Sequence, residues 1–199
     1  MSVLEVCQLT LKDGLSMTDP TLLSNLREVR SILKTNSRFY QDLSEPSHLY
    51  IFGIWPTLAA HDEFLESPRK NEILGKQADQ TNFGWILHLN WPKEGIEALP
   101  LDAPVLAIER FWFGSGVGGE KVGNEKGLEL VGHKKGAFGN EIKYRHESSW
   151  RCHEEIKEQN EFMIFWGWDS VKEHEAFLRK EKSDGDYVKA NVVRLRNIE

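Results

Sequence analysis

LYIFGIWPTLAAHDEFL at residues 49–65 and FMIFWGWDSVKEHEAFL at residues 162–178 are two versions of one motif. Aligned at an offset of 113, they share six identical residues in 17 positions, where composition alone gives about one. Each runs from apolar residues through a tryptophan and a Ser or Thr cap to a histidine before a Phe-Leu pair. The pattern predicts a buried strand followed by a helix, used twice in the chain.

A second match lies on the N-terminal side of each motif. VLEVCQLTL (3–11) aligns with VLAIERFWF (105–113) at an offset of 102, so 113 − 102 = 11 extra residues separate the matched elements in the second half. We place them in 114–139, which holds nine of the sixteen glycines. Glycine at that density disfavours regular structure, so we expect a long loop or hairpin insertion there. Any helix within 120–147 is expected to be short or displaced.

The remaining elements follow from alternation, helical spacing and caps. We expect strands near 3–11, 38–43, 48–55, 83–91, 105–113, 149–156, 161–168 and 190–197. Asp19-Pro20 starts one helix, Thr57 starts another that Pro68 ends, and Ser170 with Glu173 starts a third. The order βαββαβ occurs twice, in 1–92 and 105–199, joined by the linker 93–104.

This order predicts an α+β fold of two tandem ferredoxin-like units. Such a unit covers one face of its sheet with helices and leaves the other face bare. Because the strands are apolar on both faces, the bare faces must be covered. We therefore expect the units to pack sheet to sheet as an intramolecular α+β barrel, and the protein to be a monomer or a loose homodimer.

Composition excludes several classes of partner. The net charge is −6 and there is no basic block, so we expect neither nucleic acid nor membrane as a partner. The N-terminus lacks the pattern of a signal peptide, and no stretch approaches the roughly 18 apolar residues of a spanning helix. Cys7 and Cys152 form no CxxC pair. We expect two reduced thiols in a cytoplasmic protein.

The two motifs resemble the dimeric α+β barrel superfamily, which includes antibiotic-biosynthesis monooxygenase-like and EthD-like proteins. The resemblance covers roughly 3–91 and 105–197 and rests on the strand ending in tryptophan, the cap and the histidine before Phe-Leu. It implies two ferredoxin-like units packed as a barrel, each with a pocket between sheet and helices. Members include cofactor-free monooxygenases, polyketide cyclases, decarboxylases, haem-handling enzymes and stress-responsive proteins.

His88 is our leading candidate for a catalytic residue. Alternation in the strand 83–91 places Ile86, His88 and Asn90 on one face. A buried histidine with a pKa of about 6.5 can shuttle protons, although a core histidine bonded to a backbone carbonyl is the alternative. Tyr40 and His153 align at the offset of 113. Tyr40 is a candidate for stabilising an enolate, and His153 is a candidate base. The alternative for either residue is simple exposure on an edge strand.

Other candidates surround the motifs. His61 and His174 lie one turn into the matched helices and either touch substrate or pack on the sheet. Glu109 and Arg110 interrupt an apolar strand, and alternation points their side chains to opposite faces. One of the two charges must therefore be buried and needs a partner. That partner is either another side chain in a structural pair or a substrate. We take Glu109 as a catalytic candidate. The candidate substrate-binding residues are His61, His174, Trp55, Trp168 and Arg110.

No spacing of histidines and cysteines predicts a metal site. G-x-G-x-x-G at 114–119 lacks an uninterrupted helix and a parallel βαβ unit, so we interpret it as chance. The hypothesis is a cofactor-independent enzyme of secondary metabolism, a cyclase, isomerase or monooxygenase acting on a small aromatic or polyketide-like molecule. One alternative is a non-catalytic ligand-binding or stress-response protein. A further alternative is a haem-binding or haem-degrading protein, because one histidine suffices as axial ligand.

Overall fold

The computed structural model describes residues 1–91, 95–113, 120–138, 142–152, 160–180 and 187–199. These residues form two compact units, Met1–Ile96 with Leu195–Glu199, and Glu97–Arg194. Each unit combines a sheet with helices, which confirms the predicted α+β class. Among the described residues, no helix is both long and apolar enough to cross a membrane.

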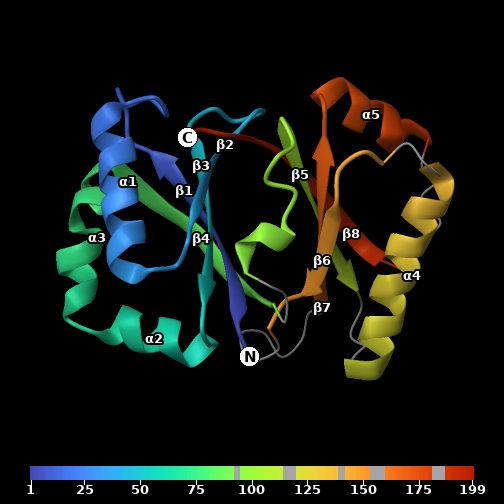
Figure 1. The fold of residues 1–199 in the computed structure, drawn as a ribbon, viewed down its shortest axis with the longest axis horizontal. Helices are drawn as coiled ribbons and strands as arrows, with labels where there is room; N and C mark the ends of the chain where they lie inside the picture. The colour runs from blue at the N-terminus through green and yellow to red at the C-terminus, as the bar shows by residue number, and fades with distance from the viewer. Residues whose placement is uncertain (92–94, 114–119, 139–141, 153–159, 181–186) are drawn as a thin grey trace. The chain divides into compact units, whose positions relative to one another are not determined.

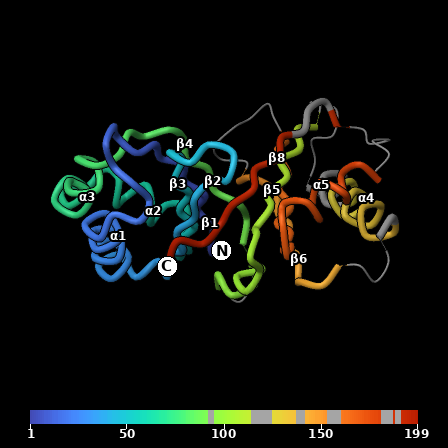
Figure 2. Tube along the Cα trace, turned by 90° about the horizontal axis from the view of Figure 1, so that it is seen from above, coloured from blue at the N-terminus to red at the C-terminus, as the bar shows by residue number. Residues whose placement is uncertain are grey.

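The first unit has the strand order of a ferredoxin-like fold. Its strands are β1 (Val3–Leu11), β2 (Arg38–Asp42), β3 (His48–Trp55) and β4 (Thr81–Asn90), in the order β4-β1-β3-β2. The central strand β1 pairs antiparallel with both β3 and β4. Helices α1 (Pro20–Leu33), α2 (Leu58–Glu66) and α3 (Arg69–Gln80) lie on one face of this sheet (Figures 1 and 2). The other edge strand, β2, pairs with Leu195–Asn197 at the C-terminal end of the chain.

Helix α1 begins where the sequence indicates. The Asp19 carboxylate accepts the backbone N–H groups of Thr21 and Leu22 at 2.7 and 3.2 Å, and Pro20 occupies the first turn. Its apolar face meets the sheet through the buried Leu22 and Leu26. Lys34, in a left-handed conformation, ends the helix. The amphipathic pattern and the caps therefore position this helix.

Helix α3 was not predicted from the sequence. We expected one helix after Thr57, ending at Pro68, and a strand at 83–91, with no element assigned between them. The segment RKNEILGKQADQ is mostly polar, contains a glycine and buries only Ile73, so its apolar stripe is too narrow to stand out. Polar contacts with α1 hold it in place: Lys76 pairs with Glu28 at 2.8 Å, and Asn25 donates to Gln80 at 2.7 Å.

The second unit repeats the strand order of the first. Its strands are β5 (Val105–Phe113), β6 (His146–Trp150), β7 (Asn160–Trp168) and β8 (Tyr187–Asn197), in the order β8-β5-β7-β6. Its helices are α4 (Glu120–Phe138) and α5 (Val171–Lys180), and the short 3-10 helix η1 (Ile96–Ala98) spans the boundary between the units. Val105 pairs with Trp168 as Val3 pairs with Trp55. The matched tryptophans therefore hold the same position relative to the first strand of each unit.

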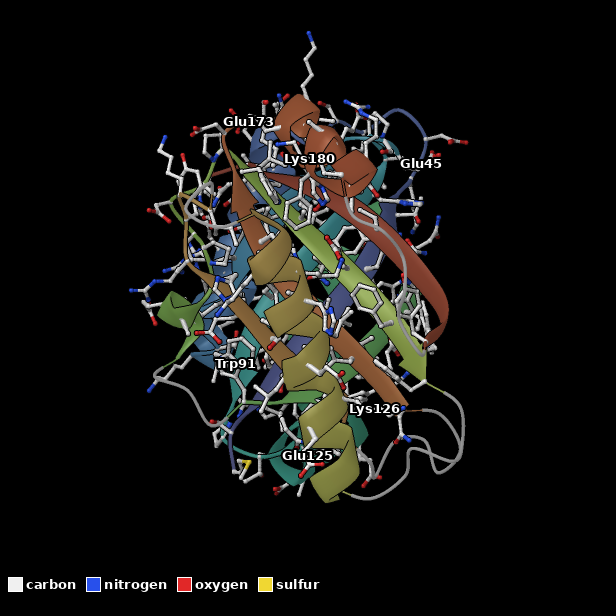
Figure 3. The ribbon with its side chains drawn as sticks, turned by 90° about the vertical axis from the view of Figure 1, so that its right-hand side faces the viewer. Glu45, Trp91, Glu125, Lys126, Glu173 and Lys180 are labelled. Carbon is white, nitrogen blue, oxygen red and sulfur yellow. The ribbon has the colours of Figure 1, made fainter. Side chains whose placement is uncertain are left out.

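The expectation of a long loop at 114–139 is wrong for most of that segment, because Glu120–Phe138 is the helix α4. Figure 3 looks onto this helix lying along the second sheet, with Glu125 and Lys126 near its N-terminal end. Residues 114–119 lie outside the described residues. A helix does follow the G-x-G-x-x-G run, but β5 pairs antiparallel with β7. The parallel βαβ setting of a dinucleotide site is still missing.

Gly127 lets the glycine-rich helix α4 pack closely against the sheet. A Cβ atom at this position would lie 2.8 Å from Phe162 Cε2 and 3.1 Å from Trp150 Nε1. The helix can therefore approach β6 and β7 closely only because this residue has no side chain. Packing against the sheet outweighs the weak helix propensity of its glycines.

We expect alanine to have opposite effects at two glycines of α4. Gly132→Ala meets nothing within 4 Å, so it should stabilise the protein by about 0.5–1 kcal/mol through helix propensity. Gly127→Ala gains the same propensity but is forced against Phe162, and should destabilise the protein by about 1–3 kcal/mol. Urea unfolding measures both values. Equal stabilisation by both substitutions would show that α4 does not pack closely on the sheet.

Candidate active site

A cavity of about 350 Å³ lies between the sheet and the helices of the first unit. Its volume falls within the range of small-molecule sites, about 300–1,000 Å³. Most of its wall is apolar and comes from α1, α3 and the strands, including Leu26, Val29, Leu33, Phe39, Ile51, Leu74, Phe83 and Ile86. Its polar lining residues are Glu5, Cys7, Arg30, Thr35, Ser37, His61, Lys70 and Gln77.

Glu5, His61 and His88 form a compact cluster bordering this cavity. His61 Nε2 lies 3.2 Å from Glu5 Oε2, and the rings of His61 and His88 lie 4.5 Å apart. Both histidines are 2% exposed. Trp55 donates its Nε1 proton to the same Glu5 Oε2 at 2.7 Å, and its ring packs edge-on against His61. The carboxylate is therefore held from two sides.

Three elements bring these side chains together. Antiparallel pairing of β1 with β4 sets Glu5 directly opposite His88, and directly opposite residues share one face of a sheet. The Thr57 hydroxyl caps α2 by accepting from Ala60 N at 3.1 Å. This cap starts the helix at the end of β3, so His61 falls in its first turn, above Glu5. The strand register and one helix cap thus build the cluster.

Burial controls the ionisation of the acidic groups here. Burial raises the pKa of the Glu5 carboxyl above its ordinary value of 4.5, while His88 and the Trp55 N–H oppose part of this rise. Burial, assisted by the charge of Glu5, also raises the pKa of the Cys7 thiol far above its ordinary value of 9.0. Cys7 therefore stays protonated near neutral pH and is unsuited to act as a nucleophile.

The cluster has the composition of a small metal site. Among the described residues, Glu5, His61 and His88 each offer one ligand atom, and these atoms lie within 4.8 Å of one another. His61 Nε2 faces Glu5 Oε2 at 3.2 Å, so this ring nitrogen is engaged by the carboxylate. In the second unit both ring nitrogens of His174 are engaged, by Glu109 and Arg194.

The structure brings three predicted residues together and separates another. His61, Trp55 and Ile86 line the cavity, and His88 does not line it but packs its ring against His61. Tyr40 is only 1% exposed, so the expectation of an exposed edge residue is wrong. It does not line the cavity, since its neighbour Phe39 faces that side of β2. Burial raises the pKa of Tyr40 to about 12.

The proposed match between Tyr40 and His153 is also wrong. Tyr40 pairs with Tyr50, and Met163, which corresponds to Tyr50 at the offset of 113, pairs with Ser149. Ser149 therefore holds the place of Tyr40 in the second unit. The second strands are offset by 149 − 40 = 109 and the third strands by 163 − 50 = 113, because the connection between the second and third strands is four residues longer in the second unit. His153 itself lies outside the described residues.

In the second unit, a buried ion cluster lies between the sheet and the helices. Glu109 and His174 are 1% and 0% exposed, and Glu109 Oε1 lies 3.3 Å from His174 Nε2. The ammonium group of Lys134 on α4 lies 2.7 Å from Glu109 Oε2. Burial alone would raise the pKa of Glu109, but the His174 hydrogen bond and the Lys134 charge outweigh burial and lower it. This carboxylate is charged and paired, as a structural group would be.

Arg110 has a partner outside that cluster, whereas Trp168 packs on its histidine. Arg110 pairs with Glu161 at 2.5 Å, and its guanidinium lies over the Trp112 ring. Trp168 stacks on His174 and also lines a second hollow of about 350 Å³. Two further lining residues of this hollow, Glu173 and Lys180, are labelled on α5 in Figure 3. Lys143 and Tyr144 also line it and bond to Asp169, so this hollow is polar at its rim.

Glu5 is the site residue that the sequence analysis missed. It interrupts the apolar strand VLEVCQLTL as Glu109 interrupts VLAIERFWF. The same argument, that a buried charge needs a partner, applies to both residues. A search for acidic residues on the helix-covered face of each first strand would have found it.

Comparison with known proteins identifies the fold. No protein-family model and no curated protein matches the chain. A candidate monooxygenase from Lactobacillus acidophilus NCFM is 10% identical over 100% of this chain and 94% of its own, with a TM-score of 0.56. A candidate chlorite dismutase is 12% identical over 98% and 94%, with a TM-score of 0.65. An anthrone oxidase-like protein is 12% identical over 99% and 92%, with a TM-score of 0.59.

These structures are similar to this chain in fold, and they confirm the ferredoxin-like α+β class. The predicted resemblance holds at that level. The neighbours are mostly described as enzymes, but identities of 7–12% do not transfer their activities.

Loss of Lys134 should expose how the second unit balances its buried charge. Lys134→Met removes the cation beside Glu109 while keeping an unbranched chain near Phe111 and Phe177, and should cost about 3–5 kcal/mol. Lys135→Met, at the exposed neighbouring position, should change stability by less than about 0.5 kcal/mol. Urea unfolding of both variants measures the difference. Comparable small losses would mean that the Lys134–Glu109 pair contributes little.

Acidification should remove the stabilisation that the Glu109 carboxylate provides. Its pKa in the folded protein lies below the ordinary value of 4.5. The contribution is therefore complete above that value and is lost as pH falls through the folded pKa. The advantage of wild type over Glu109→Gln in unfolding free energy should shrink as pH is lowered from about 6 to about 3. An advantage that stays constant over this range would contradict the lowered pKa.

Proposed function

We propose that the first unit is an enzyme that binds a small, mainly apolar molecule in its cavity and transfers a proton to or from it through the Glu5–His61 pair. The observation that carries the proposal is a largely apolar cavity bordered by a carboxylate–histidine pair, with His61 Nε2 3.2 Å from Glu5 Oε2 and both side chains largely shielded from solvent. A solvent-shielded proton-transfer group beside space for a ligand is a common arrangement in acid–base catalysis.

Each residue of the cluster has a defined task in this proposal. Glu5 takes the proton from an activated carbon of the substrate, and the Trp55 N–H holds the carboxylate in one orientation. His61 shares the proton with Glu5 across 3.2 Å. His88, packed against His61 and set opposite Glu5 in the sheet, is the second partner for charge that develops at this end of the cavity.

The chemistry of the wall suggests the type of substrate. Phe39 and Phe83 are among the apolar lining residues, so a planar aromatic or polyketide-like molecule would be in contact with rings. Removal of a proton from an activated carbon is the first step of cyclisation, isomerisation and oxygenation alike. The fold neighbours include monooxygenase-like and anthrone oxidase-like proteins, which supports an oxidative variant of this reaction.

A ligand-binding protein without catalysis is the competing function. It needs the cavity but not the cluster, whereas the enzyme needs both. The presence of a carboxylate–histidine pair at the cavity favours the enzyme. The second unit is assigned no reaction, because its corresponding carboxylate is balanced by Lys134.

Solvent deuterium exchange tests the proton transfer directly. Anthrone, a tricyclic ketone with an acidic C–H group, is incubated anaerobically with the protein in deuterated buffer, and deuterium uptake is followed by mass spectrometry. We expect wild type to accelerate exchange and Glu5→Gln to slow it by about 100-fold or more. Glu45→Gln, which changes an exposed glutamate in the connection between β2 and β3, is the matched control and should leave the rate unchanged.

Two further outcomes decide between the functions. Equal exchange rates with wild type and Glu5→Gln, at equal binding of anthrone, would rule out the Glu5 mechanism and leave a binding protein. If anthrone does not bind, the same measurement is made with a smaller hydroxyaryl 1,3-diketone. Admission of air after exchange then separates an oxygenase, which consumes oxygen, from an isomerase or cyclase, which does not.

A further inference from the structure

We infer that Glu5, His61 and His88 form a binding site for one divalent first-row transition-metal ion at the end of the first unit's cavity. This goes beyond the proposed proton transfer, which needs no metal. It also goes beyond the sequence analysis, in which no spacing of histidines indicated a metal site. The three residues come from two strands and a helix that are distant in the chain, so a motif search could not find them.

The distances are close to those that a metal ion requires. Bonds of about 2.0–2.2 Å to nitrogen and oxygen set neighbouring ligand atoms roughly 3 Å apart. His61 Nε2 and Glu5 Oε2 already lie 3.2 Å apart, and the ligand atoms of all three residues lie within 4.8 Å of one another. Glu5 and His88 are direct partners in the β1–β4 pairing. Binding of one ion requires the ligand atoms that are now within 4.8 Å of one another to come to roughly 3 Å.

The ligand set selects the class of ion. Two imidazoles and one carboxylate bind Fe(II), Co(II) and Zn(II), and they leave coordination positions for water or substrate. An ion held here borders the cavity, because Glu5 and His61 both line it. Trp55 Nε1 donates to Glu5 Oε2 at 2.7 Å and so orients the carboxylate from outside the site. Such an ion supplies a Lewis acid next to an apolar ligand space.

The second unit shows how the same fold balances a buried carboxylate without a metal. There, Lys134 places an ammonium group 2.7 Å from Glu109 Oε2, and His174 bonds the other oxygen. Within the part of the chain that the structure describes, no lysine or arginine forms a salt bridge with Glu5, whose ion-pair partner is His61. A divalent cation between Glu5 and the two histidines would provide the positive charge that Lys134 provides in the second unit.

Metal titration of the full chain tests the inference. The protein is treated with a chelator, dialysed and titrated with Zn(II) by calorimetry and with Co(II) by visible absorption. We expect one ion per chain, and binding weakened by at least about 10-fold in Glu5→Gln and in His88→Phe, which keeps a ring next to His61. His133→Ala, at an exposed histidine on α4, is the matched control and should bind as wild type does.

Several outcomes would overturn the inference. These are no binding of either metal, binding unchanged in both site variants, or binding lost in His133→Ala. Circular dichroism checks that each variant is folded. If a site variant unfolds, X-ray absorption of the Co(II) wild-type protein replaces it and must show two imidazole ligands. Deuterium exchange by the metal-free protein is measured separately, so failure of the metal site and failure of the proton transfer can be told apart.

Discussion

A carboxylate placed in an apolar strand must be hydrogen-bonded, paired or neutralised, and this requirement organises both units. In each unit the acid lies on the first strand and the partner is a histidine in the first turn of the helix after the third strand. The acids are not at matched positions, because the alignment of β1 with β5 sets Glu5 against Ala107 and Cys7 against Glu109. The two positions share a face, so one histidine position serves both.

What surrounds this pair decides what each unit can do. In the first unit, the helices over the pair present Leu26, Val29, Leu33 and Leu74, and space of about 350 Å³ remains beside Glu5. In the second unit, α4 lies close on the sheet through Gly127 and brings Lys134 to Glu109. A buried cation tied to the carboxylate leaves it no proton to exchange and no position for a metal. The same kind of pair therefore borders a cavity in one unit, where we propose that it reacts, and is bound to a buried lysine in the other.

The sequence predicted part of the site, and the reasons for success and failure differ. His88, His61 and Trp55 were found because strand alternation and the matched motifs place them on the face that meets the helices. Glu5 was missed although it carries the same signal as Glu109. Tyr40 was assigned a catalytic role that its place on the opposite face of β2 does not support. Which face of an edge strand is buried depends on its neighbours and not on its own residues.

Sequence alone determined the class of fold, because alternation, helical spacing and caps are local properties that each segment carries with it. The strand β1, the cap at Asp19 and the buried strand before Trp55 could all be recognised in this way. Tertiary structure alone decided that a glycine-rich segment is the helix α4, that α3 forms from a mostly polar segment, and that Glu5, His61 and His88 meet. These outcomes depend on contacts between segments far apart in the chain, and no local pattern records such contacts.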